Sequence, residues 1–388
     1  MSKNIKETLL STLVHGEETL ENIKVLRKVS KDNITTENQA DKYIDRLHAK
    51  ELHLVINEII DTKKDAKIFR LTSENGYLPP FEAGQYINIF VEIDGVRVSR
   101  PYSLSSSPRQ RSYYEITIAD IKDGFVSTYM CNNAKVGDHI SSTSPSGVFR
   151  YQPVYHSKKS LFLAGGSGIT PFLSMTREIL DANQDRDVVM LYGVNDENKA
   201  LYDEEFSNYA KNHPNFKYHL VVSGKDSQYK GERGFIDAKL IERLVPDYSE
   251  RTAYICGPQI MNSFCDKELR SLGLKNKNIR REMFGATKNI TEEAGWPSEL
   301  SGNEVFNITI GDKVIPARAN ESILVALERA KVRVNVCCRS GECSLCRVKL
   351  VDGKVYLSKG VLLRKADEKF GYIHSCKAYP ISDVTISL

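Results

Sequence analysis

The cysteines constrain this chain more than any other feature of its sequence. Eight occur in 388 residues, and five of the eight lie within the last 52. Four of these five follow the spacing C-x4-C-x2-C-x29-C, as Cys338, Cys343, Cys346 and Cys376. A secreted disulfide framework distributes its cysteines over a short chain, whereas a cluster at one end of a long chain indicates a metal centre.

This spacing favours a [2Fe–2S] cluster over zinc. In such a cluster one tight loop and one distant segment supply four thiolates. Three ligands from one loop require a closely wrapped backbone, and Gly341, which has no Cβ, suits that wrapping. Zinc ribbons prefer two paired C-x2-C knuckles, and only one such pair occurs here. The adjacent Cys337 is therefore expected to be a packed neighbour rather than a ligand.

Composition narrows the class of protein. A length of 388 residues corresponds to two or three domains, and 41% hydrophobic with 27% charged residues is an ordinary globular balance. The net charge of +4 is too small to indicate nucleic-acid binding. The sequence has neither a secretory signal pattern nor an apolar run near the ~18 residues of a membrane span. We therefore expect a cytoplasmic protein without a membrane span.

Hydrophobic patterning predicts a multidomain chain. Residues 1–48 carry leucines at helical spacing and predict a short helical extension, which either packs on the main body or docks a partner. Residues 49–155 contain short alternating strands between turns, typical of an antiparallel β-barrel. Residues 156–287 alternate strands with helices, which predicts an α/β domain with a parallel sheet. A polar linker, 288–303, leads to a last domain at 304–388.

Two motifs in the predicted barrel suit a flavin nucleotide. The first is Arg100-Pro101-Tyr102-Ser103, in which a guanidinium can hold a phosphate, a ring can cover an isoalloxazine face and a hydroxyl can bond flavin N5. An exposed strand end would also explain this tetrapeptide taken alone. In the second, Gly124, Val126 and Ser127 open a helix whose backbone N–H groups can hold a pyrophosphate.

A second pair of motifs, in the predicted α/β domain, suits a nicotinamide nucleotide. Glycines between a strand and a helix permit a tight turn and close approach of a pyrophosphate, although a bare turn could also be a simple connection. The partner motif follows about 85 residues later. The candidate residues are Gly166, Gly168, Thr170 and Pro171 in the first motif, and Cys256, Gly257 and Pro258 in the second.

The two flavin motifs are followed by Pro145-Ser146-Gly147-Val148-Phe149 at the end of the barrel and then by the two nicotinamide motifs. In this order they resemble the ferredoxin–NADP reductase family. The segments CRSGECSLC and GYIHSCKAYP resemble a plant-type ferredoxin domain, which implies an α+β, β-grasp-type fold for residues 304–388. The resemblance implies FAD rather than FMN, with Ile118 among its contacts. It also implies catalytic roles beside flavin and nicotinamide for Ser103, Cys256 and Glu282, the last within Glu282-Met283-Phe284-Gly285.

The choice between NADH and NADPH stays open in the sequence. Ser223 and Lys225 follow the third predicted strand of the α/β domain and offer a hydroxyl and a cation to a 2′-phosphate. Asp196 and Glu197, however, place carboxylates where such a phosphate would be repelled.

The resemblance implies an oxidoreductase that passes a hydride from NAD(P)H to FAD and then single electrons through the cluster. The acceptor would be a partner redox protein, such as an oxygenase, a hybrid-cluster protein or another reductase component. Residues 304–388 hold fourteen Lys and Arg against nine Asp and Glu, so this domain matches an acidic face either within the chain or on the acceptor. The alternatives are a non-catalytic electron-transfer subunit that does not use free NAD(P)H, and a redox-sensing regulator.

Overall fold

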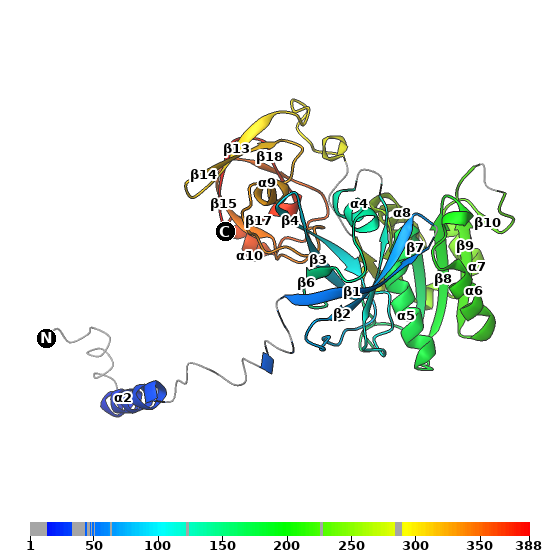
Figure 1. Ribbon diagram of the computed structural model, residues 1–388, viewed down its shortest axis with the longest axis horizontal. Helices are drawn as coiled ribbons and strands as arrows, with labels where there is room; N and C mark the ends of the chain where they lie inside the picture. The colour runs from blue at the N-terminus through cyan, green and yellow to red at the C-terminus, as the bar shows by residue number, and fades with distance from the viewer. Residues whose placement is uncertain are drawn as a thin grey trace. The chain divides into compact units, whose positions relative to one another are not determined.

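The computed structural model falls into two compact units, Met1–Ala49 and Lys50–Leu388. It describes residues 14–32, 43, 44, 47, 49, 51–62, 64–121, 124–225, 228–283 and 289–388. The first unit contains α2 (Gly16–Asp32), whose first turn carries Glu17 and Glu18, where carboxylates interact favourably with the helix dipole (Figure 1). The predicted apolar positions Leu9, Leu10 and Leu13 lie outside the described residues. Within those residues no helix is both long and apolar enough to cross a bilayer.

The second unit begins with an antiparallel sheet whose strand order is β4-β3-β6-β1-β2-β5. Its elements are β1 (Leu52–Asp61), β2 (Ala66–Ser73), β3 (Tyr86–Ile93), β4 (Val96–Ser103), β5 (Tyr114–Ala119), α4 (Phe125–Asn132) and β6 (His139–Ser142). Alternating residues of β1 are buried, because one face of the sheet turns inward. Leu54, Ile56, Phe69 and Leu71 are among the fully buried core residues.

A parallel sheet follows, with strand order β10-β9-β8-β7-β11-β12. Its strands are β7 (Lys159–Gly165), β8 (Asp187–Val194), β9 (Phe216–Val222), β10 (Glu232–Arg233), β11 (Thr252–Cys256) and β12 (Ile279–Glu282). The helices between them are η1 (Gly166–Ile169), α5 (Thr170–Asp181), η2 (Glu197–Lys199), α6 (Asp203–Asn212), α7 (Ala238–Leu244), η3 (Tyr248–Glu250), α8 (Gln259–Ser271) and η4 (Asn276–Asn278).

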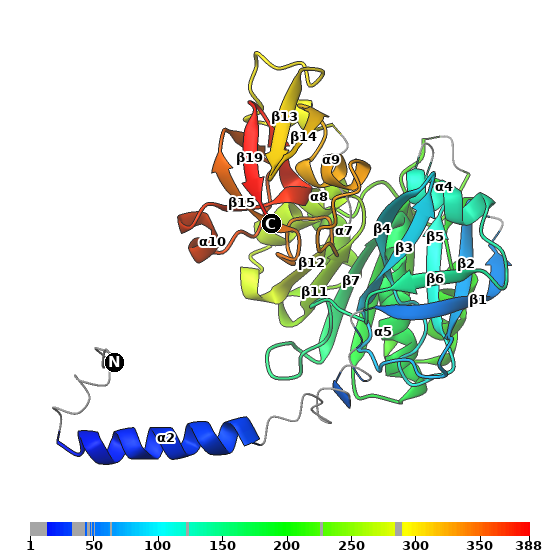
Figure 2. The same cartoon turned by 60° about the vertical axis from the view of Figure 1, so that its left-hand side comes forward.

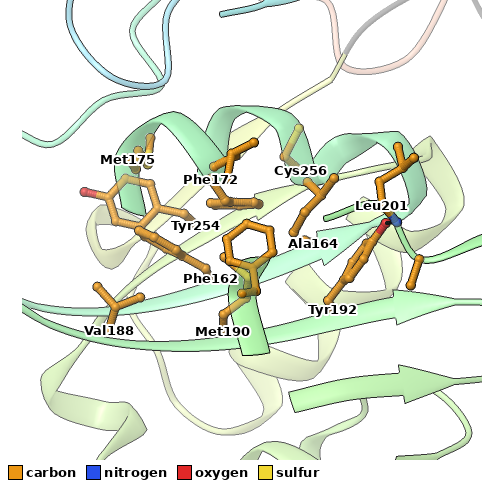
Figure 3. Packing of buried hydrophobic residues seen from close by; sticks show 14 of the residues in the cluster. Phe162, Ala164, Phe172, Met175, Val188, Met190, Tyr192, Leu201, Tyr254 and Cys256 are labelled. Atoms are coloured by element: carbon orange, nitrogen blue, oxygen red, sulfur yellow. Dashed lines mark hydrogen bonds between the residues drawn. The ribbon is translucent and has the colours of Figure 1, made fainter. Parts of the chain in front are cut away.

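Each face of the parallel sheet has its own core. Alternate strand residues pack with α5 and α6 on one face and with α7 and α8 on the other. On the first face Phe162 stacks on Phe172 with ring centroids 4.7 Å apart, and Tyr254 meets Phe162 edge-on at 5.5 Å (Figure 3). Phe149, at the end of the antiparallel domain, packs against Phe172 and Tyr254, so this core continues into the preceding domain.

The C-terminal part is an α+β domain built on a mixed sheet with strand order β14-β13-β19-β15-β17 (Figure 2). Its elements are η5 (Ile290–Glu292), β13 (Val305–Ile310), β14 (Lys313–Arg318), α9 (Ile323–Arg329), β15 (Arg347–Asp352), β16 (Val355–Leu357), α10 (Lys365–Lys369), β17 (Tyr372–His374), η6 (Ser375–Lys377), β18 (Ala378–Pro380) and β19 (Val384–Ser387). Helix α9 packs on the sheet through Ile323, Ala326 and Leu327.

The segment predicted as a linker contacts the C-terminal domain. The Glu293 carboxylate accepts hydrogen bonds from Tyr356 Oη at 3.2 Å, Ser358 Oγ at 3.2 Å and the Lys359 backbone N–H at 3.0 Å. The Trp296 ring lies 5.2 Å from that of Tyr356. These contacts fasten residues 293–296 to the domain that follows them.

Candidate functional site

The first predicted flavin motif lies at the end of β4. Arg100 and Tyr102 are half-buried on one face of β4, while Ser103, on the other face, is 4% exposed. Arg100 Nη1 donates to the Ser99 carbonyl at 2.7 Å. Burial, together with the positive charge of Arg339, lowers the pKa of Arg100 to about 10, so this guanidinium is still charged at neutral pH.

The second flavin motif forms the N-terminus of α4. Gly124 precedes the helix, and a Cβ on it would lie 2.2 Å from Ser127 Oγ and 2.7 Å from the Ile121 carbonyl. The position therefore requires glycine. The first N–H groups of a helix lack intrahelical partners and point toward its N-terminal end. Val126 and Ser127 are buried beside this end, whereas the predicted contact Ile118 is fully buried in β5 and exposes no surface.

The two nicotinamide motifs are in contact with each other. A Cβ on Gly168 would lie 2.4 Å from the Cys256 carbonyl oxygen and 2.7 Å from Gly257 Cα, so both backbones meet at this glycine. Gly166 has φ +52°, and a Cβ there would meet nothing within 4 Å, which leaves open space above the turn. Thr170 and Pro171 begin α5, and Thr170 Oγ1 donates to the Ser167 carbonyl at 3.1 Å. Pro258 is the N-cap residue directly before α8.

Cys256 and Glu282 face each other in register on the neighbouring strands β11 and β12. Both are almost completely buried, at 2% and 4% exposed. Burial raises the pKa of the Cys256 thiol well above its usual value, and the nearby Glu282 adds to this. A protonated thiol is a poor nucleophile, so the environment of Cys256 fits a positioning role. Burial likewise raises the pKa of Glu282, whose Oε2 has no hydrogen-bond partner within the described chain.

Ser223 and Lys225 follow β9, next to the acidic turn of η2. Ser223 Oγ donates to Asn195 Oδ1 at 2.8 Å, while Arg233 Nη2 donates to the Gly224 carbonyl at 2.7 Å. Arg233 therefore lies beside the predicted 2′-phosphate position, as an additional cation.

The cysteine loop is wrapped by backbone in the left-handed region. Arg339 (φ 54°), Gly341 (φ 82°) and Ser344 (φ 60°) adopt it. This conformation turns the N–H groups of Ser340 and Cys343 toward Cys338 Sγ, each at 3.4 Å. Such donors favour a thiolate because they hydrogen-bond to the charged form.

The four predicted ligands form two pairs. Cys338 and Cys343 lie together in one buried cluster, which also holds Cys337 and Tyr86, and Cys346 and Cys376 lie together in another. Within the described residues no three His, Cys, Asp or Glu side chains surround a single metal position. Two separate thiol pairs fit a binuclear iron centre, in which each iron takes two cysteines, better than one tetrahedral ion surrounded by four.

The same loop is fastened to the antiparallel domain. Cys337 Sγ donates to Tyr86 Oη at 3.5 Å and lies 3.5 Å from Ser146 Oγ. Asn88 Nδ2 donates to the Val336 carbonyl at 3.0 Å. Cys337, predicted as a packed neighbour, is thus buried at this junction between domains.

Sequence reasoning assigned no role to Arg339, the residue after the first predicted ligand. Its guanidinium is 5% exposed, pairs with Glu328 on α9 and donates to Ser99 Oγ at 3.2 Å. Arg339 therefore joins the cysteine loop to the strand that carries Arg100. Its position inside the cysteine motif was the only signal in the sequence.

Comparisons with known proteins agree with the three parts of this arrangement. Residues 53–151 match the oxidoreductase FAD-binding domain, 162–267 the oxidoreductase NAD-binding domain and 308–380 the 2Fe-2S iron-sulfur cluster binding domain. An NADPH oxidoreductase of Mycobacterium tuberculosis is 30% identical over 337 residues, which cover 85% of this chain and 84% of that protein. The chain belongs to the ferredoxin–NADP reductase family of flavoprotein reductases. It is an oxidoreductase with an additional C-terminal [2Fe–2S] domain.

Further relatives align with most of the chain. The glycine betaine monooxygenase reductase subunit of Chromohalobacter salexigens is 29% identical over 343 residues, covering 85% of this chain and 93% of that protein. The solved structure of phthalate dioxygenase reductase aligns with a TM-score of 0.64 at 28% identity, covering 87% of this chain and 98% of that one. The predicted fold class and the predicted cofactors, FAD, NAD(P) and [2Fe–2S], are confirmed.

Proposed function

We propose that this chain is the reductase component of a multicomponent oxygenase system. It would take a hydride from NADH or NADPH and pass single electrons to a partner protein. The observation that carries the proposal is that one compact unit holds all three cofactor-binding domains, with the cysteine loop bonded to the strand of the flavin motif. Bound FAD supplies a two-electron carrier and the [2Fe–2S] cluster a one-electron carrier, so that electrons arriving in pairs leave singly.

For the flavin, the proposal assigns one task to each polar group at the end of β4. Arg100 holds a phosphate, the Tyr102 ring covers the isoalloxazine and the Ser103 hydroxyl bonds N5. The half-buried state of Arg100 and Tyr102 supports this, since each still offers a face to a ligand. The N-terminus of α4, with Gly124, Val126 and Ser127, would hold the pyrophosphate.

For the nucleotide, the open space above Gly166 supports a pyrophosphate position at the start of α5. Gly168, Thr170 and Pro171 would form the rest of this turn, and Cys256, Gly257 and Pro258 the opposite wall. Cys256 would position the nicotinamide. Glu282, with its unpartnered Oε2, would belong to the hydrogen-bond network beside the flavin.

For the cluster, the proposal assigns Cys338 and Cys343 to one iron and Cys346 and Cys376 to the other. The pairing of these thiols and the two N–H donors to Cys338 Sγ support the assignment.

The proposed acceptor is an oxygenase component with an acidic face. Two relatives are named as monooxygenase or dioxygenase reductases, which supports the class of acceptor. The excess of fourteen basic over nine acidic residues in 304–388 supports the charge of its face. The proposal places the protein in the cytoplasm, where thiols stay reduced.

Steady-state turnover of the purified protein tests the proposal. With FAD, iron and sulfide restored, we expect continuous reduction of ferricyanide by NADH or NADPH, because ferricyanide accepts electrons from reduced flavin without a partner protein. A non-catalytic subunit of a larger complex would give no turnover with either nucleotide, and that result would contradict the proposal.

A further inference from the structure

The outer side of the cysteine loop carries a surface that the assignments above do not use. Residues 341–347 lie beside residues 358–365, because the Leu362 backbone N–H donates to the Gly341 carbonyl at 3.0 Å. Asp367 joins the far ends of the two segments, since its carboxylate accepts hydrogen bonds from one arginine in each, at 2.7 and 3.0 Å. The two segments therefore form one continuous surface.

Two large apolar side chains are exposed on this surface. Leu345, which precedes the predicted ligand Cys346, is 49% exposed, and Leu362 is 62% exposed. Single exposed leucines are common on protein surfaces, but these two stand on segments that are bonded together. An apolar centre within a charged rim is the usual composition of a protein–protein interface.

The rim of the surface is basic. Arg347, Lys359, Arg364 and Lys365 are all exposed, and within the described chain neither lysine forms an ion pair. Asp367 is 5% exposed and is shared between both arginines, so it neutralises only one of the two.

The acidic content of the two segments is small. Glu342 is the one carboxylate in their sequence and is half-buried, while the neighbouring Glu293 bonds the Lys359 backbone N–H at 3.0 Å. We define the six residues Leu345, Arg347, Lys359, Leu362, Arg364 and Lys365 as the docking surface.

We propose that the docking surface binds the acidic face of the one-electron acceptor protein. The inference rests on the proposed function, because it locates where electrons leave the chain. Leu345 directly precedes Cys346 in the sequence. An acceptor bound at Leu345 would therefore lie at the edge of the cysteine loop, away from the loop's contacts with Tyr86 and Ser99. The leucines would exclude water at the contact, while the four cations would steer the acidic partner and set its orientation.

A matched pair of probe proteins tests this. Native cytochrome c has a basic surface, and succinylated cytochrome c is the same haem protein with its lysines converted to carboxylates. At low ionic strength we expect the chain to reduce the succinylated form at least about tenfold faster, and we expect high salt to remove the difference. The K359E/K365E variant should lose this preference, whereas K359R/K365R should keep it.

The control is K313E/R318E, which changes net charge equally on β14, at the opposite edge of the sheet from β17. It should keep the preference for the succinylated probe. Retention of the preference in K359E/K365E, or an equal loss in the control, would overturn the proposal, because net charge rather than this surface would then decide the rate.

Failure of the docking surface and failure of the proposed function give different results. Ferricyanide turnover and the bleaching of the flavin and cluster bands by NAD(P)H are measured on every variant. If both occur and the probes are reduced equally, only the docking surface is wrong. If neither occurs in the wild-type protein, the proposed function is wrong.

Discussion

The antiparallel domain meets its two neighbours through very different junctions. Toward the nucleotide domain the core is continuous, and Phe149 packs at 5.7 Å from the ring of Phe172 and 5.6 Å from that of Tyr254. Arg177 adds a buried ionic link, because it contacts Glu115 at 2.7 Å and Glu205 at 2.8 Å. Toward the [2Fe–2S] domain, hydrogen bonds are grouped around residues 336–339, and Tyr86 packs with Cys337 and Cys338 in a small cluster.

The difference follows from what each junction has to transfer. A hydride moves only when the reacting atoms are held about 3–3.5 Å apart, so the flavin and nucleotide domains require a rigid shared core. An electron passes between carriers without a bond being formed. A smaller junction that holds the cysteine loop near the flavin motif is then sufficient.

Loss of the cluster should distinguish the functions of the two junctions most clearly. In Cys343→Ser we expect loss of the cluster absorbance and of cytochrome c reduction, because one iron loses a thiolate ligand. Ferricyanide reduction by NAD(P)H should stay within about twofold, since that path ends at the flavin. Loss of both activities would show that the cluster supports the flavin site itself.

Breaking the ionic link to the nucleotide domain should cost the most stability. In Arg177→Ala the 2% exposed Glu115 loses its main cation but keeps its ion pair with Arg70 at 3.1 Å, so we expect a loss of about 1.5–3 kcal/mol in the free energy of unfolding. Urea denaturation measures it. The control Arg270→Ala removes a pair that is 43% exposed on the arginine side and should cost less than about 1 kcal/mol. Equal losses would mean that this junction is not specially stabilised.

The nucleotide junction should also respond to pH through His156. Burial and the charge of Arg280 lower the pKa of His156 to about 4, so the folded chain binds fewer protons than the unfolded chain between about pH 4 and 6.5. Stability is therefore full above pH 6.5 and is lost as the pH falls. Between pH 7 and 5 this group should account for about 2 kcal/mol. A comparison of His156→Gln with wild type at both pH values measures it, and identical pH dependence would disprove it.

The smallest expected effect is on the rate of electron transfer across the [2Fe–2S] junction. In Arg339→Ala the cysteine loop loses its bond to Ser99 and its ion pair with Glu328, and we expect the reduction of the cluster by NAD(P)H to slow by roughly a few fold, because the loop is held less firmly beside the flavin motif. Stopped-flow absorbance measures this rate, while flavin reduction should be unchanged. The control Arg329→Ala removes an exposed pair with Glu321 on α9 and should not slow the cluster. Slowing of flavin reduction instead would place Arg339 in the hydride path.

The sequence was most informative where backbone geometry demands one residue type. Gly124 and Gly168 have no room for a Cβ, and the spacing of the cysteines is set by a loop that wraps sulfur. Such requirements are local, so a short motif expresses them. The strands around these motifs were also predictable from alternation and from buried apolar runs.

The junctions left no such local signal. Cys337 and Tyr86 are 251 positions apart, and Arg177 and Glu115 are 62 apart, so only the tertiary structure brings them together. Ile118 is fully buried in β5, and the contact with the flavin that the family resemblance implies stays a prediction. Opposite charges stand in the segments that follow β8 and β9, with Asp196 after the first and Lys225 after the second, so no prediction of NADH over NADPH follows from the sequence.

The central claim is that one chain carries electrons from a nucleotide through flavin to a one-electron centre. An anaerobic optical titration of the reconstituted protein with NADH, and separately with NADPH, tests it directly. We expect both the flavin band and the cluster shoulder to bleach, and the nucleotide with the sharper endpoint is the physiological one. If neither band bleaches with both cofactors bound, the nucleotide site does not function and the account is wrong.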